Sequence, residues 1–182
     1  MEERLIIAGF GGQGILFSGK LWAELMVAKG HNVTYFPSYG AEVRGGTCNC
    51  HVIISDDEIA SPTIEEATSL IVLNQPSLTR FAPRLQGDGV AIVNSSLADP
   101  DTLTDHDHVF ALPATDIAGE LGNARVANVV VMGAYNAARH LASFEELEDF
   151  LKRDLETRKK LDLLDVNLQA LRAGRDRFEQ QQ

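Results

Sequence analysis

Apolar runs and helix-spaced apolar positions alternate along the first part of the chain. Arg4–Gly9 is an apolar run short enough for a buried strand, and glycines crowd the positions that follow it. Apolar residues then recur at helical spacing from Ile15 to Met26, and Gly30 is placed to end that helix. Asn32–Phe36 predicts a second strand. Strand, glycine loop, helix and strand form a βαβ unit, whose crossover is almost always right-handed.

The middle of the chain reads as further strands with little helix between them. In Thr47–Ser55 apolar side chains alternate, so that Cys48, Cys50, Val52 and Ile54 share one face of a strand. Shorter apolar runs predict strands over Leu70–Leu73, Val90–Val93 and Val109–Leu112. A short helix is expected over Pro76–Leu85, and Gly87–Gly89 is a turn signal.

The last third of the chain is predicted to be helical. Arg125–His140 is apolar on most faces, which indicates a buried helix, and Asn128 within it is expected either to bond a loop or neighbouring subunit or to be satisfied in the core. Ser143 and Glu146 have capping-box spacing and open a charged amphipathic region from about 144 to 178, broken near Gly174. Strands interleaved with helices predict an α/β fold, a three-layer α/β/α domain with a mixed, mostly parallel sheet and a Rossmann-like start. We expect residues 1–182 to form a single domain.

Composition limits what this chain can bind. Of 182 residues, 45% are apolar, which is enough for a real core and excludes a disordered chain. Lys and Arg total 16 against 26 for Asp and Glu, a net charge of −10, so nucleic acid is not an expected partner. An anionic ligand would need a local site. No apolar run approaches the roughly 20 residues of a membrane span, and the first residues lack the features of a signal peptide, so we expect a cytoplasmic protein with no membrane contact.

The cysteines and histidines do not predict a metal or redox centre. Cys48 and Cys50 are too few for a disulfide framework or an iron–sulfur cluster, which needs about four ligands. On a strand His51 faces away from both thiols, so they are interpreted as small buried side chains. His106 and His108 are interpreted as part of an exposed polar turn. No metal ligands are therefore assigned.

The glycine loop carries the first functional signal. Gly9, Gly11 and Gly14 form G-x-G-x-x-G after a strand and before a helix, where free amides and the helix dipole favour an anion. An NAD site also needs an acidic residue at the end of the second strand, and Thr34–Pro37 has none. Lys20 is displaced from the P-loop position. Binding of an anionic group or partner loop, and a tight turn required only for packing, both remain open.

A second unusual loop, Pro37–Gly46, follows the second strand. Arg44 presents a rigid fork of donors suited to a carboxylate or phosphate, or to an internal pair with Glu42. Tyr39 could bond, stack on a ligand or simply pack, and Ser38 has no paired base in the sequence, so no catalytic residue is assigned. Because sites gather at the carboxyl ends of parallel strands, the two loops are expected to be neighbours.

Together, GFGGQG at Gly9–Gly14 and SYGAEVRGG at Ser38–Gly46 resemble the gamma subunit of 2-oxoacid:ferredoxin oxidoreductases. Further resemblance at Thr47–Ser55, Arg125–Ala134 and Asn167–Gly174 extends it over almost the whole chain. The resemblance implies a complex in which thiamine diphosphate on alpha and beta subunits decarboxylates a 2-oxoacid. Iron–sulfur clusters on partner subunits pass two electrons to ferredoxin, and coenzyme A takes the acyl group. The gamma subunit would carry neither thiamine nor clusters, would be inactive alone, and would help form the coenzyme A side.

The resemblance also assigns a set of contact residues and leaves the substrate open. The loop pattern looks like the 2-oxoglutarate branch, with branched-chain 2-oxoacids and indolepyruvate as alternatives. Alpha, beta and a candidate delta subunit are the implied partners, ferredoxin is contacted only indirectly, and the isolated chain could self-associate. A stand-alone nucleotide-binding module or a structural scaffold would be the rival functions. The residues assigned to the coenzyme A side are Gly9, Gly11, Gly12, Gln13, Gly14, Ser38, Tyr39, Glu42, Arg44, Gly45 and Gly46.

Overall fold

The computed structural model describes residues 1–39 and 46–182. The strands are β1 (Glu2–Phe10), β2 (Asn32–Tyr39), β3 (Thr47–Ser55), β4 (Ala67–Val72), β5 (Leu85–Asn94) and β6 (Val109–Leu112). The α-helices are α1 (Ile15–Ala28), α2 (Gln75–Phe81), α3 (Ala114–Glu120), α4 (Ala127–Arg139), α5 (Phe144–Thr157) and α6 (Leu164–Glu179). Helices α1 and α2 stand between strands, β2 to β4 follow one another without an α-helix, and the last four α-helices come after β6.

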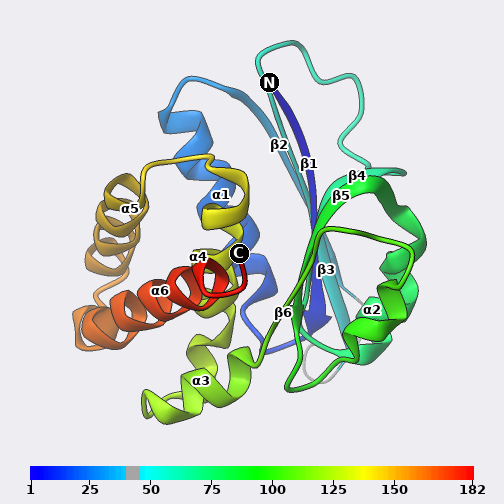
Figure 1. The fold of residues 1–182 in the computed structure, drawn as a ribbon. Coiled ribbons are helices and arrows are strands. Elements are labelled where there is room, and N and C mark those ends of the chain that lie inside the picture. The colour runs from blue at the N-terminus through cyan, green and yellow to red at the C-terminus, as the bar shows by residue number, and fades with distance from the viewer. Residues whose placement is uncertain (40–45) are drawn as a thin grey trace.

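The six strands form one mixed sheet with the order β2-β3-β1-β4-β5-β6 (Figure 1). β1, β4, β5 and β6 pair in parallel, whereas β3 runs antiparallel to both β1 and β2. Five strands therefore point the same way and β3 alone is reversed. This confirms the predicted mixed, mostly parallel sheet. β3 also separates the two strands of the predicted βαβ unit, which are not neighbours in the sheet.

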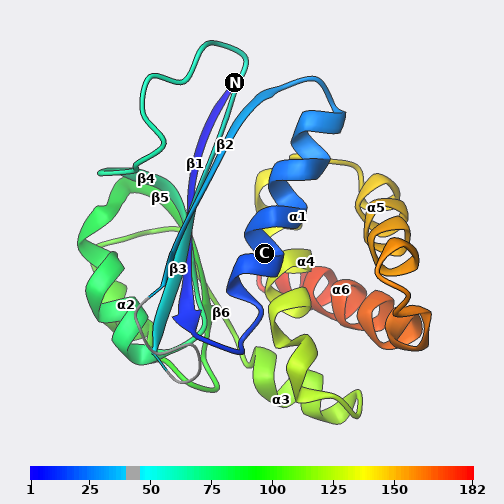
Figure 2. The ribbon, with the colours of Figure 1, turned by 180° about the vertical axis from the view of Figure 1, so that it is seen from behind.

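Helices cover the sheet unequally. α2 lies on one face, while α1, α3, α4, α5 and α6 lie on the other, with α1 between the sheet and α5 (Figures 1 and 2). Each face has its own apolar core, because side chains alternate along each strand. Cys50, Val52 and Ile54 belong to the core beneath α1, and Ile53 belongs to the α2 side. The predicted alternation of β3 is thus confirmed.

Strand bounds differ from the sequence prediction in several places, and the differences in β2 and β5 have a local cause. β2 continues through Pro37 to Tyr39 instead of ending at Phe36, because an edge strand tolerates a proline that cannot donate to a ladder. The predicted turn at Gly87–Gly89 is wrong, since these residues lie inside β5. Ala67 pairs with Leu85 and Ser69 with Val90, so the β5 segment bulges there to hold more residues than its partner.

The break expected near Gly174 is also wrong. Gly174 lies inside α6, and the two C-terminal helices are instead separated before Leu164. The glycine is needed where α6 crosses α4, because a Cβ at Gly174 would lie 1.8 Å from the carbonyl oxygen of Val130. Gly133 on α4 is equally constrained, with a Cβ position 2.0 Å from the carbonyl oxygen of Leu171. The paired glycines let the two backbones touch.

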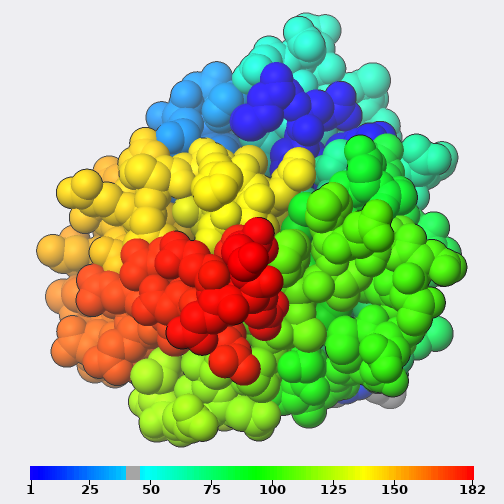
Figure 3. All heavy atoms as spheres, in the orientation of Figure 1, coloured from blue at the N-terminus to red at the C-terminus, as the bar shows by residue number. Residues whose placement is uncertain are grey.

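The other helical predictions hold in outline. The buried helix is α4, preceded by a 3-10 turn, and the Ser143–Glu146 capping box is present at the start of α5. The short helix at α2 ends earlier than expected and continues as a 3-10 turn. On the surface, the end of α6 lies between the α4–α5 turn and the β5–β6 segment (Figure 3). Across residues 1–39 and 46–182, none of the helices combines the length and apolar character that a membrane span requires.

The α4–α6 crossing gives a direct test of the packing. Gly174→Ala should lower the free energy of unfolding by about 1–3 kcal/mol or more, because the added methyl meets backbone atoms that cannot rotate away. Gly119→Ala is the matched control, since that α3 glycine has open space around its Cβ position and alanine favours a helix. Urea unfolding measures both changes. Equal stability of Gly174→Ala and wild type would contradict the crossing.

Candidate functional site

The glycine loop and the β2–β3 connection meet at one edge of the sheet. The β1–β3 ladder runs to the pair Phe10–Thr47, so the end of β1 lies beside the start of β3. One residue further, the Gly11 amide donates to the carbonyl of Gly46 at 2.9 Å. Because β2 runs in the direction of β1, its last residue, Tyr39, reaches the same edge. The structure therefore brings the glycine loop beside the two described ends of the second predicted loop.

Gly9, Gly12 and Gly14 of the loop are each constrained in a different way. Gly12 and Gly14 have φ angles of 101° and 76°, which side chains rarely adopt. A Cβ at Gly14 would also lie 2.5 Å from Nδ2 of Asn128, whereas the Cβ position of Gly12 faces open space. A Cβ at Gly9 would lie 2.7 Å from Oε1 of Gln13. Packing alone explains Gly9 and Gly14, and Gly12 is the glycine that is exposed.

Two amide side chains hold the loop from behind. Oε1 of Gln13 accepts from the Phe10 amide at 2.7 Å and from Nδ2 of Asn74 at 2.9 Å, while its Nε2 donates to the Leu73 carbonyl at 3.3 Å. The Gln13 side chain is therefore committed to internal bonds. Asn128 on α4 is buried and donates to Oγ of Ser18 at 3.2 Å and to the Gly14 carbonyl at 3.4 Å. Asn128 bonds the loop, one of the roles expected for it.

A hollow of about 490 Å³ opens at this edge. Its walls are the glycine loop with Phe10, the first turn of α1 with Leu16 and Phe17, and Tyr39 and Cys48 from the neighbouring strands. Tyr39 is 67% exposed and stands at the rim. The walls are largely apolar, and the Gly11 amide is already bonded, so the hollow suits an uncharged chain better than a bare phosphate. The sequence motif alone favours the opposite.

The remaining residues of the second loop are divided. Ser38 is exposed on β2, Gly46 bonds the glycine loop, and Tyr39 lines the hollow. Glu42, Arg44 and Gly45 lie outside the described residues. Phe10, Leu16 and Phe17 line the hollow but were not singled out in the sequence, where they read as ordinary apolar residues of a strand and a helix.

Both cysteine side chains are buried. Burial raises the pKa of the Cys48 thiol, and burial followed by the nearby Cys48 raises that of Cys50 further. His51 points to the opposite face, where its Nδ1 accepts from the Ile64 amide at 2.9 Å. Burial and then the nearby Arg84 lower the pKa of His51, which agrees with Nδ1 acting as a hydrogen-bond acceptor. Cys48, Cys50 and His51 thus do not converge, and the described residues contain no cluster of three or more metal-ligating side chains.

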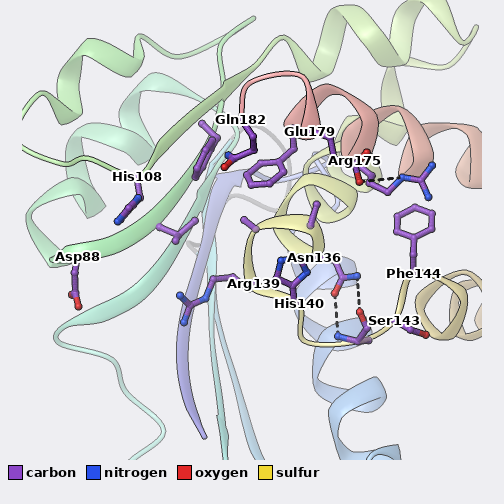
Figure 4. A pocket seen from close by; sticks show the side chains of 16 residues that line it. Asp88, His108, Asn136, Arg139, His140, Ser143, Phe144, Arg175, Glu179 and Gln182 are labelled. Carbon is purple, nitrogen blue, oxygen red and sulfur yellow. Dashed lines mark hydrogen bonds and ion pairs between the residues drawn. The ribbon is translucent and has the colours of Figure 1, made fainter.

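A second, larger hollow of about 650 Å³ lies near the β6 edge (Figure 4). The two arginines of its lining already have partners within the chain. Arg139 donates from Nε at 3.1 Å and from Nη2 to Oε2 of buried Glu3, which also accepts from the Tyr135 hydroxyl at 2.9 Å. Arg175 stacks on Phe144, 4.2 Å from the ring centroid, and bonds Asp176. None of the predicted site residues that the structure describes lines this hollow.

Comparisons with known proteins identify relatives along nearly the whole chain. The family described as pyruvate ferredoxin/flavodoxin oxidoreductase matches residues 4–177. The 2-oxoglutarate synthase subunit KorC of Archaeoglobus fulgidus is 32% identical over 174 residues, which cover 95% of this chain and 86% of that protein. The ketoisovalerate oxidoreductase subunit VorA of Methanothermobacter marburgensis is 35% identical over 176 residues. That match covers 96% of this chain but only 36% of VorA.

Solved structures share the fold. The gamma subunit of a keto/oxoacid ferredoxin oxidoreductase from Geobacter sulfurreducens superposes with a TM-score of 0.78 at 26% identity, covering 98% of this chain and 99% of that one. A 2-oxoglutarate:ferredoxin oxidoreductase from Magnetococcus marinus has a TM-score of 0.85 at 22% identity, with 98% of this chain and 31% of that chain covered. The second likeness supports the fold alone.

The two left-handed glycines separate packing from conformational strain. Gly12→Ala should lower the free energy of unfolding by roughly 1–2 kcal/mol through backbone strain alone. Gly14→Ala should cost clearly more, because its methyl also overlaps the Asn128 amide. Combining Gly14→Ala with Asn128→Ala should show coupling between the two positions in a double-mutant cycle. Urea unfolding of the wild type, the three single variants and the double variant measures these changes. Equal losses for both glycine variants and no coupling would contradict this geometry.

Proposed function

The chain belongs to the pyruvate ferredoxin/flavodoxin oxidoreductase family, and from this premise we propose that it is the gamma subunit of a coenzyme-A-acylating 2-oxoacid:ferredoxin oxidoreductase. Its relatives carry names of such enzymes, and its fold matches a solved gamma subunit along the full length of both chains. Thiamine diphosphate and iron–sulfur clusters belong to partner subunits in this proposal. When bound there, thiamine supplies decarboxylation and the clusters supply electron transfer.

The observation that carries the proposed role is the hollow shared by the two loops. An apolar, partly open channel edged by backbone suits the extended, mostly uncharged pantetheine arm of coenzyme A. The chain's own contribution would be to orient that arm and exclude water around it. Among the described residues near the hollow, burial raises the pKa of the Cys48 and Cys50 thiols and His51 bonds Ile64 on the other side of the sheet, so this proposal assigns proton and electron transfer to the partners.

The substrate proposed first is 2-oxoglutarate. The KorC relatives are separate chains that this sequence covers at 81–96% of their length, whereas it spans 36% of each VorA relative. Ketoisovalerate is the second candidate, because the VorA proteins are 35–36% identical to this chain. Alpha and beta subunits, with a candidate delta subunit, are the proposed partners.

Reconstitution tests the subunit role. The isolated chain should be inactive, and adding it to purified alpha and beta subunits, with any delta subunit, should restore 2-oxoglutarate- and coenzyme-A-dependent reduction of an electron acceptor. Comparing the rates with 2-oxoglutarate and with ketoisovalerate in the same assay ranks the two candidate substrates. Full activity of the partner subunits without this chain, with the same KM for coenzyme A, would contradict the proposal.

Tyr39 tests the hollow within the assembled complex. Tyr39→Ala should raise the KM for coenzyme A roughly fivefold or more, because about 1 kcal/mol of apolar contact is lost at the rim. Phe36→Ala is the control, since Phe36 is an exposed aromatic residue of the same strand that faces His51 on the other side of the sheet. An unchanged KM in Tyr39→Ala, with intact assembly by size-exclusion chromatography, would count against this hollow.

A further inference from the structure

A third hollow adjoins the glycine-loop hollow along α1. It holds about 590 Å³ between α1, β2 and α5. Leu16 and Phe17 form walls of both hollows, so the two meet across the first turn of the helix. The Tyr35 hydroxyl donates to the Leu16 carbonyl at 3.1 Å and fixes the edge strand against this shared wall. Figure 2 shows α1 flanked by the sheet and by α5, the two sides that enclose the space.

The character of the walls changes from one hollow to the next. The glycine-loop hollow contains no charged side chain among its described lining residues. The third hollow is lined by the cations Lys20, Arg153 and Arg158 and by two anions, Glu24 and Asp154. Its lining is therefore net positive, by 3 − 2 = +1, in a chain whose net charge is −10.

The surroundings add to this positive charge. Lys152–Lys160 contains five cations against two anions, Asp154 and Glu156, so nine residues hold five of the sixteen Lys and Arg side chains. The cations of the α5 end, with Lys20 facing them from α1, form what we call the α5 basic cluster: Lys20, Lys152, Arg153, Arg158, Lys159 and Lys160. Within this stretch of α5 and the residues after it, cations outnumber anions.

Two guanidinium groups of the cluster are held in place by aromatic rings. Arg158 lies 5.1 Å from the ring centroid of Phe17, on the wall that both hollows share. Arg153 lies 5.7 Å from the ring centroid of Phe150. Stacking orders a guanidinium while leaving its edge donors open, which lowers the entropic cost of binding an anion.

The anions of the lining engage two of its three cations. Asp154 pairs with Nε of Arg158 at 2.8 Å and is largely buried, so these two charges offset each other and Arg158 offers a ligand its terminal Nη donors. Glu24 pairs with Lys20 at 3.4 Å on the exposed surface of α1, where such a pair is weak. Arg153 donates to the backbone carbonyl of Asp149 and forms no ion pair within residues 1–39 and 46–182. Among the three lining cations, Arg153 is thus the one without an anionic partner in the described part of the chain.

We propose that the third hollow is the phosphate subsite of the same ligand cleft, in which Arg153 and Arg158, with Lys20, bind the phosphorylated nucleotide end of coenzyme A. This inference rests on the proposed function. Coenzyme A joins an uncharged arm to a 3′-phosphorylated ADP, and the paired hollows divide in the same way. The arm lies along the glycine loop with its thiol directed away from α5, and the phosphates lie against Arg153, Arg158 and Lys20, the three cations that line the third hollow.

The test uses the assembled complex and a ligand fragment that has phosphates but no thiol arm. Adenosine 3′,5′-bisphosphate should inhibit competitively against coenzyme A. Arg153→Gln and Arg158→Gln should each raise its Ki, and the KM for coenzyme A, about tenfold. Lys152→Gln is the matched control, because it removes a neighbouring cation of the same helix that does not line the hollow. If Arg158→Gln impairs folding, Arg158→Lys replaces it. This variant keeps the positive charge, so its Ki should lie between that of the wild type and the about tenfold higher value expected for Arg158→Gln.

The outcomes separate this inference from the function on which it rests. A raised KM for coenzyme A in Tyr39→Ala, with unchanged Ki in both arginine variants, would overturn the phosphate subsite and leave the proposed function standing. No change in any of these variants would overturn both. Failure of the bisphosphate to inhibit the wild-type complex, or equal effects of Lys152→Gln and Arg153→Gln, would also overturn the subsite. A rise in the Ki of the bisphosphate that is confined to the two arginine variants supports the subsite. Weaker inhibition of the wild-type complex at higher salt supports it as well.

Discussion

The reversed strand β3 is the constraint on which the rest of the site depends. Lying between β1 and β2, it starts at the edge where both of those strands end, and the ladder to Phe10–Thr47 holds the three ends together. The bond from the Gly11 amide to the Gly46 carbonyl then joins the glycine loop to the start of β3. In a fully parallel sheet the connection after β2 would return to the opposite edge. The hollow at the start of α1 therefore follows from the direction of one strand.

This arrangement changes what the glycine motif does. Gln13 and Asn128 hydrogen-bond the glycine loop, and the Gly11 amide donates to the Gly46 carbonyl. A motif that suggests phosphate binding therefore forms one wall of an apolar hollow. Positive charge is found instead at the end of α5, beyond Leu16 and Phe17. In the proposed function, the two chemically different ends of one ligand would be recognised by two elements far apart in sequence.

Much of the fold could be predicted because period and turn chemistry are local signals. Alternation placed β3 and its two faces, and Ser143 with Glu146 marked the start of α5. The errors arose where a distant partner decides. Gly174 reads as a helix break until Val130 is seen against it, and Gly87–Gly89 reads as a turn until the bulge opposite β4 is known. The two loops were predicted from their motifs. The third hollow could not be predicted, because it is lined by α1, β2 and α5, whose contact depends on tertiary packing rather than on a local sequence pattern.

Amide hydrogen exchange on the assembled complex, with and without coenzyme A, tests most directly whether this edge of the sheet is the ligand site. The account predicts that coenzyme A slows exchange in peptides covering residues 10–17 and 150–158, and leaves residues 136–144 beside the β6-edge hollow unchanged. Protection at residues 136–144 with none at residues 10–17 would contradict it.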